Sequence, residues 1–69
     1  MMNYRMGDEI VVKIDRDGIG HDKGIGHLSD ESMVIIFGAG ERVGEDVQAI
    51  ITDLFNTDAG SSYLALAKA

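Results

Sequence analysis

Residues 15–30, DRDGIGHDKGIGHLSD, hold the side chains whose types and spacing come closest to a ligand-binding motif. The stretch contains Gly-Ile-Gly-His twice, with carboxylates before and between the copies. Three interpretations fit such a composition: a calcium loop, a glycine-rich phosphate cradle, or a connection between two strands. The spacing of the residues decides among them.

A calcium loop of the EF-hand kind needs oxygen ligands at positions 1, 3 and 5, glycine at 6 and glutamate at 12. When Asp15, Asp17 and Gly18 are placed at positions 3, 5 and 6, Lys13 falls at position 1 and Gly24 at position 12. Neither residue offers a side-chain oxygen. We therefore do not expect calcium to bind.

Phosphate and metal sites are not expected either. Gly18, Gly20 and Gly24 are spaced one residue away from the dinucleotide fingerprint, and no Gly-Lys-Ser/Thr follows as in a phosphate-binding loop. The two histidines, His21 and His27, fall short of the four ligands of a structural zinc site, which usually include cysteine, and the chain has no cysteine. We expect no cofactor and no metal.

Catalytic side chains are equally hard to find. The chain has no Cys, and Ser29, Ser32, Ser61 and Ser62 fall in turn-like segments without an identifiable base. With twelve acidic residues in a short chain, carboxylate pairs arise by chance. The sequence therefore predicts a protein that is not an enzyme, and residues 15–30 are interpreted as a connection between strands, mobile from Asp15 to Gly18.

The composition limits the possible architectures and functions. At 69 residues the chain holds one domain, 1–69, of which residues 1–6 are expected to be a flexible N-terminal segment. No apolar run approaches the ~20 residues of a membrane helix, and we expect a cytoplasmic protein without a signal peptide. Twelve acidic residues against six basic ones give a net charge of −6, which by itself argues against nucleic acid and is explained by solubility.

The elements that position these residues are short and rich in β-branched residues. Residues 9–14 alternate as in a half-buried strand, and glycines within the strand expected over 24–28 indicate a sharp bend or a close approach of another backbone. Leu54 breaks the alternation of residues 46–55, which indicates a bulge or a bend. Further strands are expected over 33–37 and 63–68, with turns at 29–32 and 57–62, although the alanines of residues 63–68 would equally suit a short helix. Five strands with glycine turns predict an all-β, five-stranded antiparallel barrel.

Several motifs, in order, resemble the TRAM domain. They are GDEIVVKI, then GIGHL, then MVIIF followed by GAGERVGEDVQAIITDLFNTDAG, so that the similarity runs from about Gly7 to Ala67. Residues 42–47, RVGEDV, are similar to the basic-V-G-[DE]-x-V of the family, whereas Lys23 stands where a glycine is common. The segment NTDAG is closest to the version of the domain that follows PIN nuclease domains.

The resemblance implies an antiparallel, OB-like barrel that binds RNA. In larger proteins the domain accompanies tRNA-modifying enzymes, and freestanding archaeal copies are similar to RNA chaperones of the cold-shock type. Two departures bear on RNA binding. Freestanding copies tend to be basic, and Ser61-Ser62 replaces a basic residue of the PIN-linked version.

Single-stranded RNA is held by aromatic platforms beneath bases and by cations near phosphates. Phe37 and Tyr63 are the candidate platforms, and Tyr63 is favoured because its hydroxyl prefers water. Phe37 also suits the core, Tyr63 also suits a side chain that caps the barrel, and Phe55 is ambiguous. Lys13 and Lys68 are weaker candidates because they lie on expected strands. The candidate RNA-binding residues are Arg16, Lys23, His27, Phe37, Arg42 and Tyr63, with His21 as a further possible cation.

Two functions remain open. The first is a monomeric, non-catalytic domain that binds single-stranded RNA or tRNA weakly and without strong sequence preference. The second is an accessory domain of a larger protein or complex, for example with a PIN nuclease or a tRNA-modifying enzyme, whose acidic surface contacts a basic partner protein.

Overall fold

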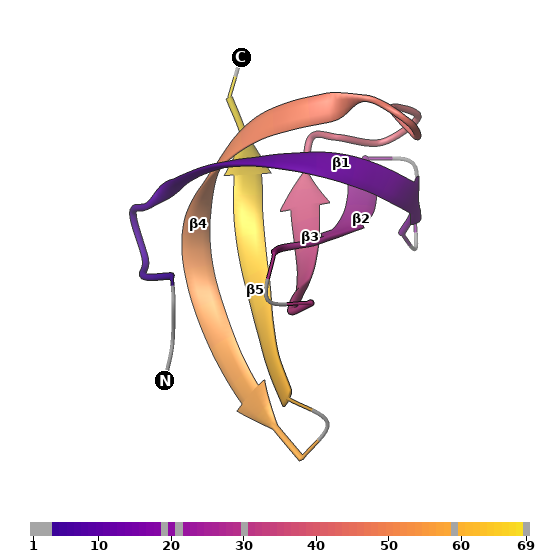
Figure 1. Cartoon of the computed structure of the whole chain (residues 1–69). Coiled ribbons are helices and arrows are strands. Elements are labelled where there is room, and N and C mark those ends of the chain that lie inside the picture. Colours follow the sequence, from indigo (N-terminus) through magenta and orange to yellow (C-terminus); the bar gives the residue numbers. More distant parts are fainter. Residues whose placement is uncertain (1–3, 19, 21, 30, 59, 69) are drawn as a thin grey trace.

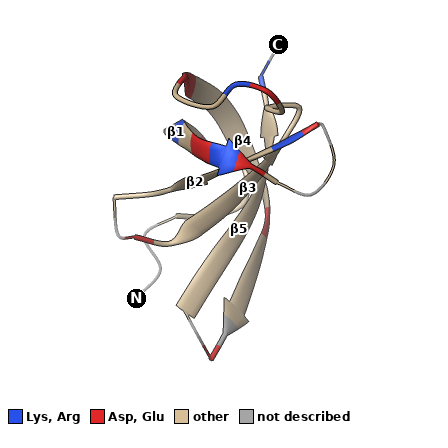
Figure 2. Cartoon of the chain, turned by 90° about the vertical axis from the view of Figure 1, so that its right-hand side faces the viewer, with Lys and Arg blue, Asp and Glu red and all other residues tan. Residues whose placement is uncertain are grey.

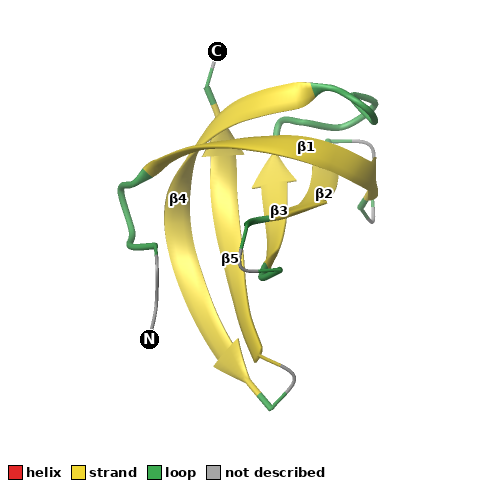
Figure 3. Cartoon of the chain, in the orientation of Figure 1, coloured by secondary structure: helices red, strands yellow, loops and turns green. Residues whose placement is uncertain are grey.

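Five strands make up most of the chain in the computed structural model, which describes residues 4–18, 20, 22–29, 31–58 and 60–68 (Figure 1). The connections between the strands are turns and loops, and no helix occurs among the described residues (Figure 3). None of these residues therefore forms a helix able to cross a membrane. The strands are β1 (Glu9–Asp17), β2 (Lys23–His27), β3 (Met33–Phe37), β4 (Asp46–Thr57) and β5 (Gly60–Ala67).

The strands close into a barrel in the order β1-β2-β3-β5-β4, with β4 returning to pair with β1. The all-β class, the five strands and the closure are as predicted. The purely antiparallel arrangement is wrong, because β3 and β5 pair in parallel. β3 has the direction of β1, because β2 is antiparallel to both. β5 also has the direction of β1, because β4 is antiparallel to both, so β3 and β5 run parallel where they meet.

The alternation predicted for the first strand is confirmed. Ile10, Val12 and Ile14 are buried, whereas Val11 and Lys13 are exposed. The expected end of this strand is wrong: β1 continues to Asp17, with a shift of register between Ile14 and Arg16. After this shift of register β1 still pairs with β2, through Arg16 with Ile25 and Asp17 with Gly24. Residues 15–17 therefore belong to the sheet and not to a connection.

The glycines of β2 allow the close approach that the sequence predicted. A Cβ added at Gly26 would lie 2.6 Å from the carbonyl oxygen of Lys13, and one at Gly24 would lie 2.8 Å from that of Ala39. Any side chain at either position would push neighbouring backbone away. β2 begins at Lys23 and ends at His27, so Leu28, expected within the strand, is a core residue just beyond it.

The long β4–β5 hairpin contains the predicted bulge. The register shifts between Ile51 and Asp53, ahead of the parity break at Leu54. Thr52, at the shift, donates a hydrogen bond from Oγ1 to the carbonyl oxygen of Leu64 at 3.3 Å. The predicted 57–62 turn is too long, because β4 reaches Thr57 and β5 starts at Gly60. Gly60 has a φ of 121°, which glycine adopts without a steric penalty.

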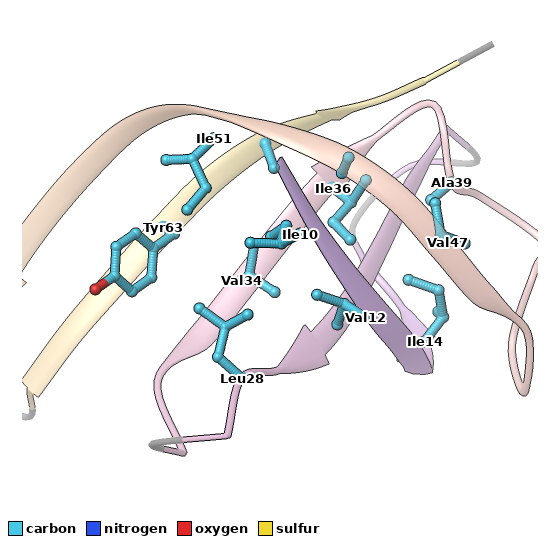
Figure 4. Close-up of a cluster of buried hydrophobic side chains, with 12 residues drawn as sticks. Ile10, Val12, Ile14, Leu28, Val34, Ile36, Ala39, Val47, Ile51 and Tyr63 are labelled. Carbon is cyan, nitrogen blue, oxygen red and sulfur yellow. The ribbon is translucent and has the colours of Figure 1, made fainter. Parts of the chain in front are cut away.

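Inward-facing side chains of β1, β3, β4 and β5 fill the barrel, together with Leu28 just after β2 and Ala39 just after β3 (Figure 4). Tyr63 lies at one end of this cluster, and the ring of Tyr4 meets it edge-on, with 5.7 Å between centroids and 79° between planes. The backbone N–H of Gly7 donates to the carbonyl of Ile51 at 2.7 Å, which fastens the segment after Tyr4 to β4. The core residues are Ile10, Val12, Ile14, Leu28, Val34, Ile36, Ala39, Val47, Ala49, Ile51, Tyr63 and Ala65.

Candidate nucleic-acid interface

One side of the barrel wall carries no carboxylate. The strands β2, β3 and β5 contain none of the twelve acidic residues of the chain, and they lie side by side. Figure 2 shows these three strands almost without charge, whereas basic and acidic residues alternate along β1. We call the outward, partly buried side chains of these three strands the outer face: Lys23, Ile25, Met33, Ile35, Phe37, Ser62 and Leu64.

A trough of about 250 Å³ lies in the outer face. Ile25, Ile35 and Leu64 are successive register partners across β2, β3 and β5, and they form an apolar row through it. Gly18, Lys23 and Phe37 complete the described lining. A hollow with an apolar row and an aromatic ring offers a planar ligand van der Waals contact rather than hydrogen bonds.

Lys23 and Phe37 are cross-strand partners at one edge of the trough. The Nζ of Lys23 lies 5.3 Å from the centroid of the Phe37 ring. A cation at this distance from a ring is attracted by about 0.5–1 kcal/mol at an exposed site. The contact therefore keeps a positive charge and an aromatic ring together at this edge of the trough.

Arg16 lies beside the trough. It is the register partner of Ile25, and directly opposed residues in an antiparallel pair point to the same side of the sheet. Its side chain is exposed, and Asp15 and Asp17 flank it in sequence. Arg16 is thus available to a phosphate near the trough, although neighbouring carboxylates weaken the local positive potential.

The other predicted cations are not gathered at the trough. Nδ1 of His27 lies 2.7 Å from Oδ2 of Asp15, with exposed side-chain fractions of 46% and 50%. Arg42 lies in the loop between β3 and β4, where its Nε donates to Oε1 of Glu45 at 3.2 Å. Both side chains therefore already face a carboxylate, and neither lines the trough.

Tyr63 is not an exposed platform, and this expectation is wrong. Its side chain is 1% exposed, and it packs in the core with its ring against Tyr4. The hydroxyl group suggested an exposed residue, but inward alternation along β5 decides its position. Phe55, which the sequence left ambiguous, is 45% exposed on β4 and lies outside the described lining of the trough.

His21 lies outside the described residues. Within the described part, no three His, Asp or Glu side chains converge as the ligands of a metal ion would.

The apolar row of the trough is what sequence reasoning missed. MVIIF was interpreted as a continuous apolar run, although its alternate residues Met33, Ile35 and Phe37 are only partly buried. Ile25 stands between two glycines that face inward, so its own side chain faces outward. The signal in the sequence was that β2 and β3 contain more large apolar residues than their inward, core-facing positions can hold.

The chain is similar to several curated proteins. An uncharacterized PIN and TRAM-domain containing protein of Synechocystis is 34% identical over 62 residues, which cover 90% of this chain and 17% of that protein. Another of that description, from Bacillus subtilis, is 27% identical over the same share of each chain. A Thermus thermophilus protein, described as uncharacterized and from the 5′ region of scsB, is 28% identical over 88% of this chain and 66% of its own length.

No family model matches the chain, and no solved structure does. The chain spans less than a fifth of the length of the PIN and TRAM-domain containing relatives described above. The resemblance drawn from the motifs is nevertheless confirmed: over nearly its whole length, the chain is homologous to proteins that carry a TRAM domain.

Proposed function

We propose that the chain is a non-catalytic RNA-binding domain that holds unpaired RNA in the trough of the outer face. The observation that carries the proposal is the absence of carboxylates from three adjacent strands of a chain with a net charge of −6. On this side of the barrel, phosphates meet the least repulsion, and the apolar row offers contact to bases. The homology to TRAM-domain proteins supports the same function.

Stacking supplies most of the affinity in this proposal. Each base stacked on an aromatic side chain contributes about 1–3 kcal/mol, and Phe37 is the described aromatic ring at the trough. Lys23 and Arg16 are the cations beside it. Two neutralised phosphates on a single strand give log K a slope of about −1.4 against log salt, so we expect micromolar or weaker binding.

Weak, sequence-tolerant binding suits a protein that must release RNA, and we propose a chaperone-like role on unstructured RNA or tRNA. A cysteine-free chain suits a reducing compartment, so we propose the cytoplasm as its location. Both statements go beyond RNA binding itself.

An NMR titration of ¹⁵N-labelled protein with an oligouridine of about ten nucleotides tests the proposal at low salt. We expect amide shifts at residues 23–25, 35–37 and 64, with residues near Tyr4 and Ser29 unchanged. An absence of shifts at millimolar RNA, or shifts confined to the end of the barrel near Tyr4, would contradict it.

A second candidate function is an accessory domain that docks on a basic partner protein. It is favoured by the interleaving of carboxylates with cations around β1 and the β3–β4 loop (Figure 2). The short share of the PIN and TRAM-domain relatives that the chain covers also favours it. Purification of the tagged chain at low salt from its source cells, followed by mass spectrometry, tests this candidate; a basic protein that competes with RNA would support it.

A further inference from the structure

We propose that the trough accommodates one purine base and that Lys23 gives it a preference for guanine. This inference rests on the proposed binding of RNA and adds to it the class of base that the trough selects. It follows from the size of the trough, its lining and the position of the one charged side chain among its described lining residues.

The trough suits a single flat ring system. Its volume of about 250 Å³ is below the ~300–1,000 Å³ of pockets that bind whole drug-sized ligands. Ile25, Ile35 and Leu64 form an apolar row in which a base loses contact with water over one side. Because the gain scales with the apolar area buried, a purine gains more than a pyrimidine.

The edge of the base faces Lys23. The ammonium group lies over the Phe37 ring, 5.3 Å from its centroid, so a base seated on the apolar row beside this ring has its edge near Nζ. An ammonium has three donors and no acceptor. Guanine presents two neighbouring acceptors, O6 and N7, whereas adenine presents N7 beside the donor amino group on N6. Guanine therefore offers the ammonium group of Lys23 two hydrogen-bond acceptors, whereas adenine offers it one acceptor beside a donor that repels it.

The rest of the described lining does not favour another base. A carboxylate would accept from the amino group of cytosine, but the described lining residues include no Asp or Glu. Gly18, Ile25, Ile35, Phe37 and Leu64 bring no polar side chain. Base discrimination in the trough depends on Lys23.

The experiment measures the affinity of labelled oligouridines of about ten nucleotides in which one central uridine is replaced. The replacements are guanine, adenine, inosine, which keeps O6 and N7, and 2-aminopurine, which lacks O6. We expect guanine and inosine to bind at least about fivefold more tightly than adenine, and 2-aminopurine to bind like adenine. Equal binding of guanine and adenine, or tight binding of 2-aminopurine, would overturn the inference.

Variants assign the preference to the ammonium group. Lys23→Met keeps an unbranched apolar stem of similar length but removes the ammonium group, and it should abolish the guanine preference, whereas Lys23→Arg should restore it. Lys13→Met, on β1 and outside the described lining, is the matched control and should keep the preference. A guanine preference that survives in Lys23→Met contradicts the inference.

The inference and the proposed function fail in different ways. If the unmodified oligouridine binds but no base is preferred, RNA binding stands and the guanine site is wrong. If no oligonucleotide binds, both proposals are wrong.

Discussion

Arg16 and Ile25 are cross-strand partners, although the adjacent pair in the ladder is Ile14 with Gly26. Between these two pairs β1 advances by two residues and β2 by one, so β1 contains one extra residue, as in a β-bulge. Ile14 faces the core, and without the extra residue Arg16 would do the same as the next residue of equal parity. The bulge is what directs a guanidinium group toward the outer face.

Removal of the Arg16 charge should change the salt dependence of RNA affinity, whereas the affinity measured at high salt should change little. For Arg16→Gln we expect the slope of log K against log salt to become less negative by about 0.7. Titrations at several potassium concentrations measure it. Arg5→Gln, remote from the trough lining, is the control, and an equal loss of slope in both variants would contradict the local role of Arg16.

Loss of the Phe37 ring should weaken RNA binding without unfolding the barrel. Phe37→Ala removes the stacking surface, so we expect a loss of about 1–3 kcal/mol in binding free energy. Phe55→Ala removes an equally large exposed ring that lies outside the described lining of the trough, and it should leave affinity unchanged. Fluorescence anisotropy measures both, and equal losses would show that the site lies elsewhere.

Neutralising Asp22 should strengthen RNA binding. Asp22 precedes Lys23 and is exposed, so its carboxylate opposes the charge that the trough offers to a phosphate. For Asp22→Asn we expect affinity to rise about twofold at low salt, with the gain lost near 1 M salt, where the screening length is about 3 Å. The same measurement on Asp58→Asn, in the β4–β5 turn, provides the comparison. A gain that persists at high salt would contradict the electrostatic cause.

A side chain at Gly26 should destabilise the fold. In Gly26→Ala the new Cβ would lie 2.6 Å from the Lys13 carbonyl oxygen and also meet Val12, and overpacking of this kind costs about 1–3 kcal/mol. Gly18→Ala is the control, since its nearest contact is the Cβ of Lys23 at 3.1 Å. Urea unfolding followed by circular dichroism compares them, and equal stabilities would show that β1 and β2 separate at little cost.

Truncation of Tyr4 should reduce stability but not RNA affinity. The Tyr4 ring lies edge-on to Tyr63, and its hydroxyl is 3.0 Å from Oγ of Ser29. Aromatic pairs contribute about 0.5–1.5 kcal/mol beyond the area they bury, so Tyr4→Ala should lose at least that much. Tyr4→Phe keeps the ring and should lose less. A fall in RNA affinity in a folded Tyr4→Ala protein would extend the site to this end of the barrel.

More of the architecture than of the candidate site could be predicted from the sequence. Alternation in residues 9–14 and the parity break at Leu54 are local signals, and they located a strand and a bulge. The parallel pairing of β3 with β5 depends on where β4 crosses the barrel, which no local pattern contains. Tyr63 was misplaced because a hydroxyl favours water only weakly, while its position in the alternation of β5 directs the ring inward.

Of the predicted site residues, Lys23 and Phe37 meet at the trough and Arg16 lies beside it. His27 and Arg42 face carboxylates whose positions depend on long-range pairing or on the shape of a loop. Residue type alone indicated candidate cations. It gave no information on which of them share a surface.

The parallel pair of strands also determines when the trough forms during folding. Leu64 lies on the last strand and joins Ile35 only after β4 has crossed the barrel, so almost the whole chain must be synthesised before the trough is complete. Contacts between distant segments form slowly. A nascent chain still lacking β5 therefore has neither a closed wall nor a complete trough, and a ligand that bound only the finished trough would stabilise the fully folded protein alone.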